Sequence, residues 1–294
     1  MTSTVGYIGS GIMATGMIKR LTENNTKVCC WNRSERNTLE AKSFGAEIFT
    51  NLSEMMKSVR ESNNGTSSPN LFFMCVSDPN AVSDILSKYG LLENLTENDH
   101  LIDMSTVSVE CVKSTSEQVK NFLEAPVSGS KPQAHGGTLV ILSAGKKSTF
   151  EHSEKYFDMM GKKTFYFGDQ IGAGARMKLC VNMFMGSVMA SLGESLALAG
   201  KSEGITSEEL VEVLMCGALA APIVNGKGKA VNAGKFDVNF PLKHQQKDMR
   251  LALDLAEGNG LDLKMASAAN ALFENRLEDC GEEDFCAVAK NYKE

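Results

Sequence analysis

A strand, a glycine turn and a helix follow one another at the amino terminus, and this order constrains the fold more than any other feature. Thr4-Val-Gly-Tyr-Ile8 reads as a short strand, and Gly9-Ser-Gly-Ile-Met-Ala14 leads into a helical pattern through Met17, Ile18 and Leu21. The first glycine permits a tight turn, the second lets the backbone approach a pyrophosphate, and a small third residue permits close helix packing. A purely structural turn is the alternative, but the position between strand and helix favours a dinucleotide site. The residues assigned to this site are Gly9, Gly11, Ile12 and Met13.

The end of the second predicted strand bears on which dinucleotide the chain binds. Lys27-Val-Cys-Cys-Trp31 runs into Asn32-Arg33-Ser34, where an NAD-binding chain usually places an acid on the ribose hydroxyls. No acid occupies these three positions, whereas the Arg33 guanidinium suits a 2′-phosphate and the Ser34 hydroxyl can donate to it. We predict NADPH rather than NADH, bound with the help of Asn32, Arg33 and Ser34. The alternative is a surface arginine at the start of a helix.

Short apolar runs alternate with helical stretches through the first half of the chain. Such alternation is typical of an α/β fold with a parallel sheet, whose strand ends line the ligand crevice. The predicted strand that ends at Asp103 is followed by Met104-Ser-Thr106 at such an end. The further predicted strands span residues 47–49, 71–76, 100–103, 137–145 and 163–167, with another beginning at Phe122.

A hydroxyl-rich turn follows the strand that begins at Phe122. Ser128-Gly129-Ser130 comes directly after Pro126-Val127. Backbone amides exposed in such a turn suit a small carboxylate. An ordinary serine turn is the alternative that the residues alone leave open.

The eleven residues from Gly172 to Asn182 join two halves of different character. Gly172 and Gly174 interrupt the chain, and a helix predicted from Ala175 then carries no charged side chain between Lys178 and Glu194. We expect this helix to be buried in a core or a subunit interface, since its fifteen uncharged residues fall short of the roughly 20 apolar residues needed to span a bilayer. Lys178 and Asn182 share one helical face. Lys178 either extends its ammonium to water or is held in a cleft for catalysis.

Composition excludes several classes of protein. A length of 294 residues favours about two domains, and a net charge of −6 without a basic run argues against nucleic acid as a partner. The four histidines are dispersed and no Cys-x-x-Cys occurs, so a metal site has little support. Cys29 and Cys30 are adjacent, and Cys75 and Cys180 lie in apolar segments, which suits reduced, buried thiols. No signal-peptide pattern precedes the first strand, so we expect a cytoplasmic protein.

The second half reads as successive helices. One is predicted over Ser207–Leu214 with Ser207 as its N-cap, a second starts in Phe240–Leu253, and a third spans Met265–Arg276. Lys247 lies in the second of these, as either a solvated or a functional lysine. We therefore expect a Rossmann-like α/β domain over residues 1–173 and an all-helical domain over 174–294, joined by a long helix.

Five motifs occur in the order found in the β-hydroxyacid dehydrogenase family, which the chain resembles over nearly its whole length. They are Gly9–Ala14, Asp103–Thr106, Pro126–Gly129, Gly172–Asn182 and Lys247-Asp248. Within the family, the chain looks most like the glyoxylate/succinic semialdehyde reductases of plants. The segments that carry this likeness are Trp31–Arg33, Met104–Val107, Pro126–Lys131 and Phe240–Leu253.

The resemblance implies a reaction and a role for each matching residue. The reaction would be reduction of a small aldehyde acid by NADPH, with Lys178 as the general acid. Asn182 would hold Lys178 and the substrate, and Ser128 with Gly129 would bind the substrate carboxylate. The active site would lie between the two domains.

Residues of the second half would complete that site. The resemblance implies that Thr106 and Lys247 border the nicotinamide end of the cofactor, that Asp248 lies near the substrate, and that Phe240 lines the pocket. We also expect a homodimer or homotetramer, because the long apolar helix suggests more buried surface than one subunit can cover, and the resemblance points the same way. No membrane is expected as a partner.

Two other functions remain open from the sequence. One is a sister enzyme working in the oxidative direction, such as a 3-hydroxyisobutyrate or tartronate semialdehyde dehydrogenase. The other is a catalytically silent dinucleotide-binding module used for assembly, like the chromatin-associated members of the family. Those members lack the lysine that Lys178 supplies here. The chain departs from the family at Ala14, which replaces the third fingerprint glycine, in the polar loop Glu61–Asn70, which looks longer than in relatives, and in the more apolar segment Gly217–Pro222.

Overall fold

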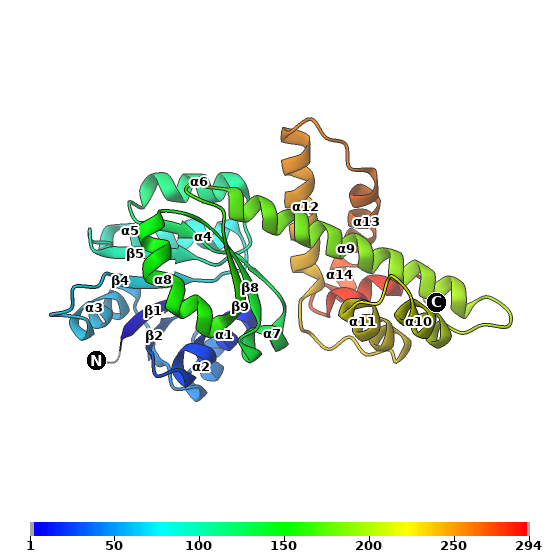
Figure 1. Cartoon of the computed structure of the whole chain (residues 1–294), viewed down its shortest axis with the longest axis horizontal. Coiled ribbons are helices and arrows are strands. Elements are labelled where there is room, and N and C mark those ends of the chain that lie inside the picture. Colours follow the sequence, from blue (N-terminus) through cyan, green and yellow to red (C-terminus); the bar gives the residue numbers. More distant parts are fainter. Residues whose placement is uncertain (1–2, 293–294) are drawn as a thin grey trace. The chain divides into compact units, whose positions relative to one another are not determined.

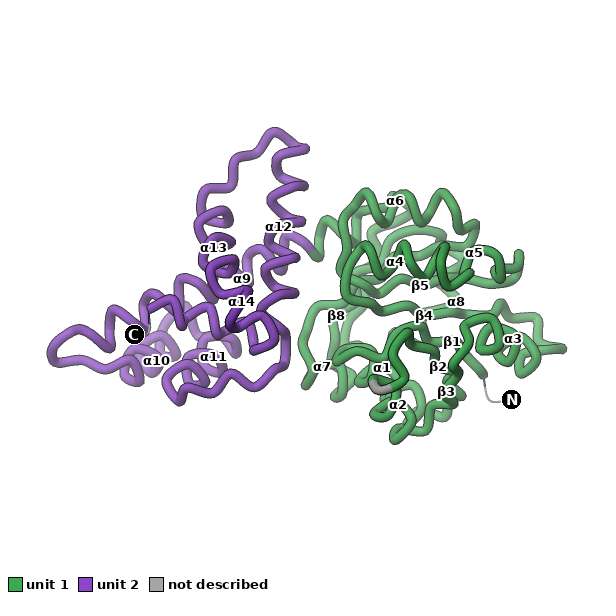
Figure 2. The backbone as a smooth tube through the Cα atoms, turned by 180° about the vertical axis from the view of Figure 1, so that it is seen from behind, with its two compact units in different colours: residues 1–178 green, residues 179–294 purple. Residues whose placement is uncertain are grey.

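The computed structural model describes residues 3–292 and separates into two compact units. Unit 1 is Met1–Lys178 and unit 2 is Leu179–Glu294, as Figure 2 shows in two colours. The division falls inside one long helix, so its first turns belong to unit 1 and the remainder to unit 2.

Unit 1 is built on a nine-stranded sheet. Its strands are β1 Thr4–Ile8, β2 Lys27–Trp31, β3 Glu47–Phe49, β4 Asn70–Met74, β5 Asp99–Asp103, β6 Phe122–Glu124, β7 Val127–Ser128, β8 Leu139–Gly145 and β9 Gly161–Tyr166. Six of them pair in parallel in the order β3-β2-β1-β4-β5-β6. Beyond β6 the sheet continues with β8, which is antiparallel to β6 and β7 and parallel to β9. This is the doubly wound order of a Rossmann-like domain, so the predicted fold is confirmed.

The strand order creates a switch point between β1 and β4. The chain leaves β1 toward β2 and β3, and then returns to place β4 on the other side of β1. Ligands of open α/β sheets bind outside the carboxyl ends of the strands at such a point. Gly9 and Cys75, which directly follow these two strands, lie at that edge.

Helices connect the strands of unit 1 (Figure 1). They are α1 Ile12–Glu23, η1 Glu35–Thr38, α2 Leu39–Ser43, α3 Leu52–Ser62, α4 Pro79–Leu86, α5 Leu91–Asn94, α6 Val109–Gln118, α7 Lys131–Gly136 and α8 Lys147–Met160. Several begin with a side-chain cap: Asn51 accepts from two amides of α3, Asp78 from Ala81 N, and Ser108 from Cys111 N. Each cap satisfies amides that have no partner inside the helix.

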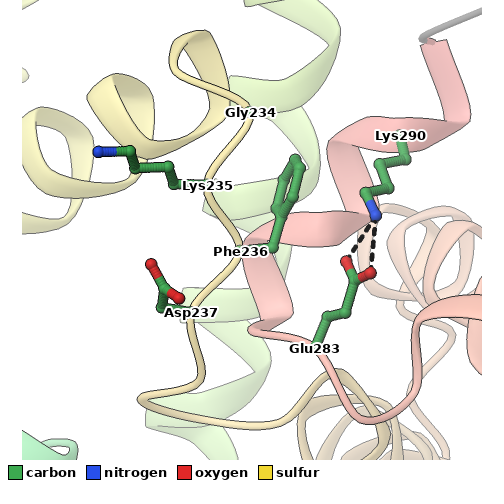
Figure 3. A pocket seen from close by; sticks show the side chains of 6 residues that line it. All are labelled: Gly234, Lys235, Phe236, Asp237, Glu283 and Lys290. Carbon is green, nitrogen blue, oxygen red and sulfur yellow. Dashed lines mark hydrogen bonds and ion pairs between the residues drawn. The ribbon is translucent and has the colours of Figure 1, made fainter.

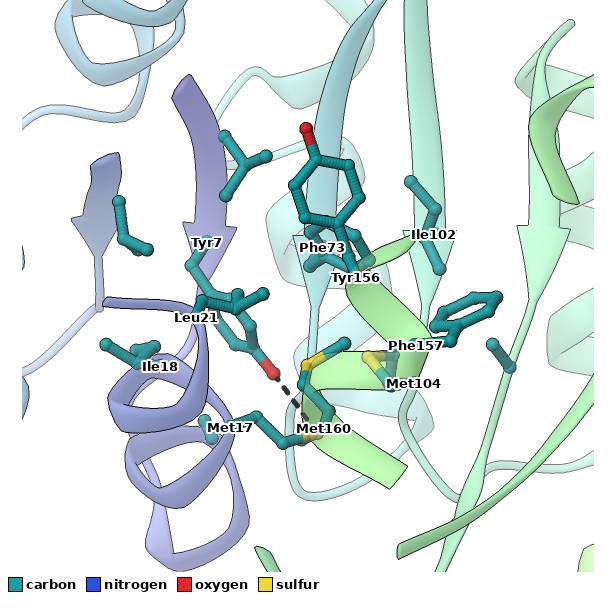
Figure 4. Close-up of a cluster of buried hydrophobic side chains, with 14 of the residues drawn as sticks. Tyr7, Met17, Ile18, Leu21, Phe73, Ile102, Met104, Tyr156, Phe157 and Met160 are labelled. Carbon is teal, nitrogen blue, oxygen red and sulfur yellow. Dashed lines mark hydrogen bonds between the residues drawn. The ribbon is translucent and has the colours of Figure 1, made fainter. Parts of the chain in front are cut away.

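The main core of unit 1 lies between the sheet and the helices α1 and α8 (Figure 4). Tyr7 of β1 stacks on Phe73 of β4 with a centroid distance of 6.1 Å, and its hydroxyl contacts the Met17 sulfur at 3.6 Å. Phe73 meets Tyr156 and Phe157 of α8 edge to face. Burial of these aromatic side chains supplies much of the hydrophobic stabilisation of the unit.

Unit 2 is entirely helical in its described part (Figure 1). It contains most of α9 Ala173–Gly200, followed by α10 Ser207–Cys216, α11 Pro222–Asn232, α12 Leu242–Gly258, α13 Lys264–Glu274, α14 Leu277–Cys280 and η2 Phe285–Tyr292. Its core joins Met189, Leu192 and Leu196 of α9 to Phe273 and Phe285. The long helix therefore serves as the central element of this core.

The long helix is longer and less buried than the sequence suggested. It begins at Ala173 rather than Ala175, so Gly174 lies inside it. Among the described residues it is the one helix whose length and composition would allow it to cross a membrane, yet it forms the core of unit 2. Only 44% of its most apolar 18-residue stretch is buried. Phe184 and Leu198 are 69% and 73% exposed. Within the single chain, the expected burial in a core therefore holds for only part of this helix.

Two local expectations also need correction. The N-cap of α10 is Thr206, which accepts from Glu209 N at 3.1 Å and forms a capping box, and Ser207 is the first helical residue. Thr206 has a glutamate three residues later and Ser207 has a leucine, so the capping-box pattern in the sequence could have identified Thr206. All eight cysteines are free thiols, but Cys180 is exposed rather than buried, because it lies on an uncovered side of α9.

Candidate active site

The glycine turn after β1 has the geometry that a dinucleotide requires. Gly9 has a φ of +101°, and a Cβ at this position would collide with the carbonyl oxygen of Cys75. Apart from its chain neighbours, no described residue has an atom within 4 Å of a Cβ built at Gly11. The helix α1 starts at the next residue, Ile12, so its first amides face this open space. The turn therefore fits a pyrophosphate.

The close helix packing near the turn depends on Gly16 rather than on Ala14. Ala14 is buried, but a Cβ on Gly16 would lie 2.7 Å from Ala134 Cβ in α7. The sequence prediction missed Gly16, although a glycine inside a helix is itself a signal of close packing. Met13 is half-buried in the first turn of α1 and packs against the unit 1 core.

The end of β2 presents the residues predicted to select NADPH. Asn32 Oδ1 accepts from Ser10 N at 3.2 Å, and Asn32 Nδ2 donates to Ser34 O at 2.8 Å, which ties this end to the glycine turn. The Arg33 side chain is 65% exposed, with Asp84 Oδ2 at 3.8 Å from Nη1. A guanidinium with so loose an ion pair can rotate onto a phosphate. These residues fit the 2′-phosphate of NADP.

Hydrogen bonds of Ser105 join the segments that follow β4 and β5. Ser105 Oγ accepts from Val76 N at 3.0 Å, and Ser105 N donates to Asp103 Oδ1 at 2.9 Å. Burial raises the pKa of Asp103 to about 6. Thr106 is half-buried directly after this serine. The loop that carries Thr106 is thus fixed by two neighbouring strands.

The turn predicted to bind the substrate carboxylate begins at the end of β7. Gly129 has a φ of +138°, and a Cβ there would lie 2.8 Å from Leu139 Cδ2, so only glycine fits. Ser128 is half-buried and Gly129 is exposed. Ser130 N donates to Gln133 Oε1 at 3.0 Å in the capping box of α7, so this amide is already used.

Lys178 lies in the second turn of α9 and is only 6% exposed. This burial excludes the alternative in which its side chain simply extends to solvent. A buried ammonium is costly unless it has a partner, and Lys178 does take part in polar interactions. A buried lysine is a suitable source of protons for a ligand.

The first turn of α9 is held by Glu124, which the sequence prediction missed. Glu124 Oε2 accepts from Ala175 N at 2.8 Å, and Glu124 Oε1 accepts from Gly172 N and, at 3.3 Å, from Gly174 N. Glu124 is 1% exposed. Burial raises its pKa to about 7, although the three amides act in the opposite direction. An acid inside the apolar run around β6 was the signal that could have found it.

In unit 2, Asn182 belongs to a buried polar network. Asn182 Nδ2 donates to Asp248 Oδ2 at 2.6 Å, and Gln245 Nε2 donates to Asn182 O at 2.9 Å. Lys247 Nζ lies 3.0 Å from Asp248 Oδ1, and only 12% of the Lys247 side chain is exposed. Lys247 is therefore not an ordinary solvated lysine, and α12 fixes the orientation of the Asn182 amide.

Phe240 precedes α12 rather than lying in it. Its amide and that of Asn239 donate to Asp284 Oδ2 at 3.3 and 3.0 Å, and its ring meets Phe285 with a centroid distance of 5.8 Å. Asp284 also pairs with Lys227 at 2.7 Å. No sequence pattern signals this anchor, since the two segments lie 44 residues apart.

The predicted residues thus fall into two sets (Figure 2). Unit 1 contains the glycine turn, the end of β2, Thr106, the Ser128-Gly129 turn and Lys178, whereas unit 2 contains Asn182, Phe240, Lys247 and Asp248.

One pocket of unit 2 has a volume of about 640 Å³ and contains none of the predicted site residues (Figure 3). Its lining includes Phe236 and the ion pair between Lys290 and Glu283, whose closest atoms are 2.6 Å apart. The Lys290 ammonium also lies 4.5 Å from the centre of the Phe236 ring. Lys235 and Asp237 also line this pocket.

Two family models together match nearly the whole chain. Residues 4–168 match the NAD binding domain of 6-phosphogluconate dehydrogenase. Residues 172–292 match the model described as the NAD-binding domain of NADP-dependent 3-hydroxyisobutyrate dehydrogenase.

Similar proteins point to the same family. Glyoxylate/succinic semialdehyde reductase 1 of Arabidopsis thaliana is 41% identical over 295 residues, which cover 98% of both chains. The chloroplastic glyoxylate/succinic semialdehyde reductase 2 of the same plant is 38% identical, over 99% of this chain and 80% of the relative. A solved 3-hydroxyisobutyrate dehydrogenase from Salmonella typhimurium shares the fold, with a TM-score of 0.86, 21% identity, and coverage of 98% and 99% of the two chains. The chain therefore belongs to the β-hydroxyacid dehydrogenase family and is an NAD(P)-dependent oxidoreductase that acts on CH–OH groups.

Proposed function

We propose that this protein reduces small aldehyde acids with NADPH, converting glyoxylate to glycolate and succinic semialdehyde to 4-hydroxybutyrate. The observation that carries the proposal is the buried Lys178 in a chain that is 41% identical to a glyoxylate/succinic semialdehyde reductase. A solvent-exposed lysine at this position would have argued against catalysis.

Lys178 has the chemistry that the reduction requires. NADPH, when bound, supplies a hydride to the carbonyl carbon of the aldehyde. Negative charge then grows on the carbonyl oxygen, where the Lys178 ammonium neutralises it and donates the proton that completes the alcohol. Such general acid catalysis typically contributes about 10²- to 10⁴-fold to the rate.

The remaining site residues take supporting roles in this proposal. Asn182, whose amide orientation Asp248 fixes, lies one helical turn beyond Lys178 and orients it and the substrate. The backbone at Ser128 and Gly129 binds the substrate carboxylate, because a glycine turn brings amide donors close to a small anion.

Four residues complete the assignment. Thr106 and Lys247 border the nicotinamide, and Phe240 lines the substrate pocket. Asp284 accepts a hydrogen bond from the Phe240 amide, and Phe285 packs against the Phe240 ring. Asp248, which forms an ion pair with Lys247, contacts the substrate.

The cofactor preference rests on the end of β2. We assign Gly9, Gly11, Ile12 and Met13 to the pyrophosphate. Asn32 shapes the adenosine end of the site, while Arg33 and Ser34 hold the 2′-phosphate. The exposed guanidinium of Arg33 supports NADPH over NADH because NADH lacks the phosphate that it would bind.

The proposal also includes the two domains of the chain and their assembly. A cofactor domain over residues 1–173 precedes a helical domain over 174–294 that binds substrate and forms a homodimer or homotetramer. Exposed apolar side chains on unit 2 support this assembly, among them Phe184, Leu198 and Val213, which are 69%, 73% and 67% exposed. A monomer by light scattering would contradict it. We also propose that the protein is cytoplasmic and that neither nucleic acid nor membrane is a partner.

Initial rates test the proposed function directly. Purified protein would receive NADPH or NADH with glyoxylate, succinic semialdehyde or methylmalonate semialdehyde, each offered separately. We expect NADPH with one of the first two to give the highest kcat/KM. NADPH binding without turnover on any of the three would instead favour the catalytically silent module.

The role of Lys178 has its own test. Lys178→Ala should abolish turnover and leave NADPH binding measurable, because the cofactor residues lie on other elements. Lys57→Ala, at a lysine whose side chain is 74% exposed, provides the control and should keep wild-type turnover. Turnover retained by Lys178→Ala would remove its catalytic role.

A further inference from the structure

Two elements that carry the proposed chemistry meet at Glu124. Glu124 ends β6, and the chain continues from there through Pro126 to the Ser128-Gly129 turn. Its carboxyl group also contacts the first turn of α9, where Ala175 precedes Lys178 by three residues. All of these residues belong to unit 1.

The contacts made by Glu124 are those of a helix cap supplied from a distant strand. The first amides of a helix have no partner within the helix. Three amide donors at the start of α9, from Gly172, Gly174 and Ala175, converge on the two carboxyl oxygens of a residue about 50 positions earlier. A carboxylate at a helix N-terminus is also favoured by the helix dipole. The start of α9 is thus fixed to the end of β6.

The two glycines at the start of α9 lie in close contact with their neighbours. A Cβ on Gly174 would lie 3.3 Å from Glu124 Oε2 and would collide with the carbonyl oxygen of Leu142. Gly172 has a φ of +94°, and a Cβ there would lie 2.8 Å from Val109 Cγ1. A side chain at Gly174 would collide with the backbone of β8, and one at Gly172 would strain the backbone, so the two glycines limit where α9 can begin.

We propose that Glu124 is a positioning residue: by holding the first turn of α9, it sets where the Lys178 ammonium lies relative to the turn that binds the substrate carboxylate. The inference rests on the proposed function, because it requires Lys178 as the acid and Ser128-Gly129 as the carboxylate site. Misplacement of a catalytic group by about 1 Å can cost roughly 100-fold in rate.

A purely structural role for Glu124 predicts a different result, and Asp99 supplies the control. Asp99 is also a buried carboxylate of unit 1, with 2% exposure. It lies at the opposite, amino end of β5, where it pairs with Arg60 and accepts from Thr96 N. Asp99→Asn should therefore reduce stability without touching α9 or the predicted site.

The test compares Glu124→Gln with Asp99→Asn in the full chain. The side-chain amide introduced by Glu124→Gln would point an NH₂ group at a backbone N–H donor, which breaks part of the cap while keeping the volume. We expect kcat of Glu124→Gln with glyoxylate or succinic semialdehyde to fall about 10- to 100-fold. The Kd for NADPH should stay within about twofold, because the cofactor residues lie on other elements. Asp99→Asn should keep both values within about twofold of wild type.

A kcat for Glu124→Gln within about twofold of that of Asp99→Asn would overturn the inference, since the cap would then be only structural. Should Glu124→Gln not fold, Glu124→Asp replaces it, because that variant keeps the charge and withdraws it by one methylene from the three amides. A fall in its kcat at constant NADPH affinity supports the inference, and an unchanged kcat overturns it.

Wild type and Lys178→Ala distinguish a failure of this inference from a failure of the proposed function. If wild type turns over none of the aldehyde acids, the proposed function fails and the inference fails with it. If wild type is active and Lys178→Ala is inactive, but Glu124→Gln keeps its kcat, only the inference is overturned.

Discussion

Glu124 makes a measurable prediction about how stability depends on pH. Burial raises its pKa to about 7 from the ordinary value of 4.5, the charge of Asp103 acts in the same direction, and the amides of Ala175, Gly172 and Gly174 act against both. The folded-state pKa is therefore above the unfolded one. Between these two values the native state binds more protons than the unfolded state, so stability falls as pH rises from about 4.5 through 7.

The size of the effect follows from the two pKa values. The difference between about 7 and 4.5, at about 1.4 kcal/mol per pKa unit, gives about 3 kcal/mol in total. Most of it, about 2 to 3 kcal/mol, is lost between pH 5 and pH 8. Glu124→Gln removes this titration and should lack that part of the pH dependence.

The assay uses the single tryptophan of the chain. Trp31 is 3% exposed in β2 and reports the unfolding of unit 1 by its fluorescence. Urea unfolding of wild type and Glu124→Gln at pH 5 and pH 8 gives four free energies of unfolding. We expect the stability difference, wild type minus variant, to be about 2 to 3 kcal/mol larger at pH 5 than at pH 8.

A difference below about 1 kcal/mol, or one of opposite sign, would refute the reasoning. The second result would mean that the three amides outweigh burial and keep the carboxylate charged. Asp103 is present in both proteins, but its charge interacts with Glu124, so part of the measured difference belongs to the pair. Wild type and variant should also unfold with the same dependence on urea concentration, which checks that the same unit is being observed.

The remaining predictions concern the cofactor, helix packing and the anchor of Phe240. Arg33→Ala should raise KM for NADPH much more than KM for NADH, and equal increases in initial-rate assays would contradict the NADPH assignment. Gly16→Ala should destabilise unit 1 by about 1 to 3 kcal/mol in urea unfolding, because overpacking against Ala134 exceeds the gain in helix propensity; unchanged stability would show that α7 can move away. Although burial opposes it, Lys227 with the neighbouring amides lowers the pKa of Asp284, so this stabilisation is present at neutral pH and decreases as pH falls through the lowered pKa. Asp284→Asn should cost about 3 kcal/mol at pH 7 and raise KM for the aldehyde through Phe240, whereas an unchanged KM would remove Phe240 from the substrate pocket.

Much of the fold could be read from the sequence because its signals are local. The strand, glycine turn and helix at the amino terminus depend on an apolar run, on a positive φ at Gly9 and on the helical period that follows. The strands of the parallel sheet were predicted to within a few residues for the same reason. The family motifs are also contiguous segments, so Lys178 and the residues around the cofactor could be named in advance.

The tertiary structure alone decided which distant polar groups meet. Glu124 holds amides about 50 positions away, and Asp248 orients Asn182 across 66 positions. Neither pairing can be predicted from the sequence, because a single buried polar side chain produces no periodic pattern. The burial of Lys178, which separates a catalytic lysine from a solvated one, is likewise a property of the folded chain. Local backbone preferences determined the elements of this protein, whereas the partners of its buried charges were determined by which elements the fold brought together, since a charge stays buried only where the fold provides its partner.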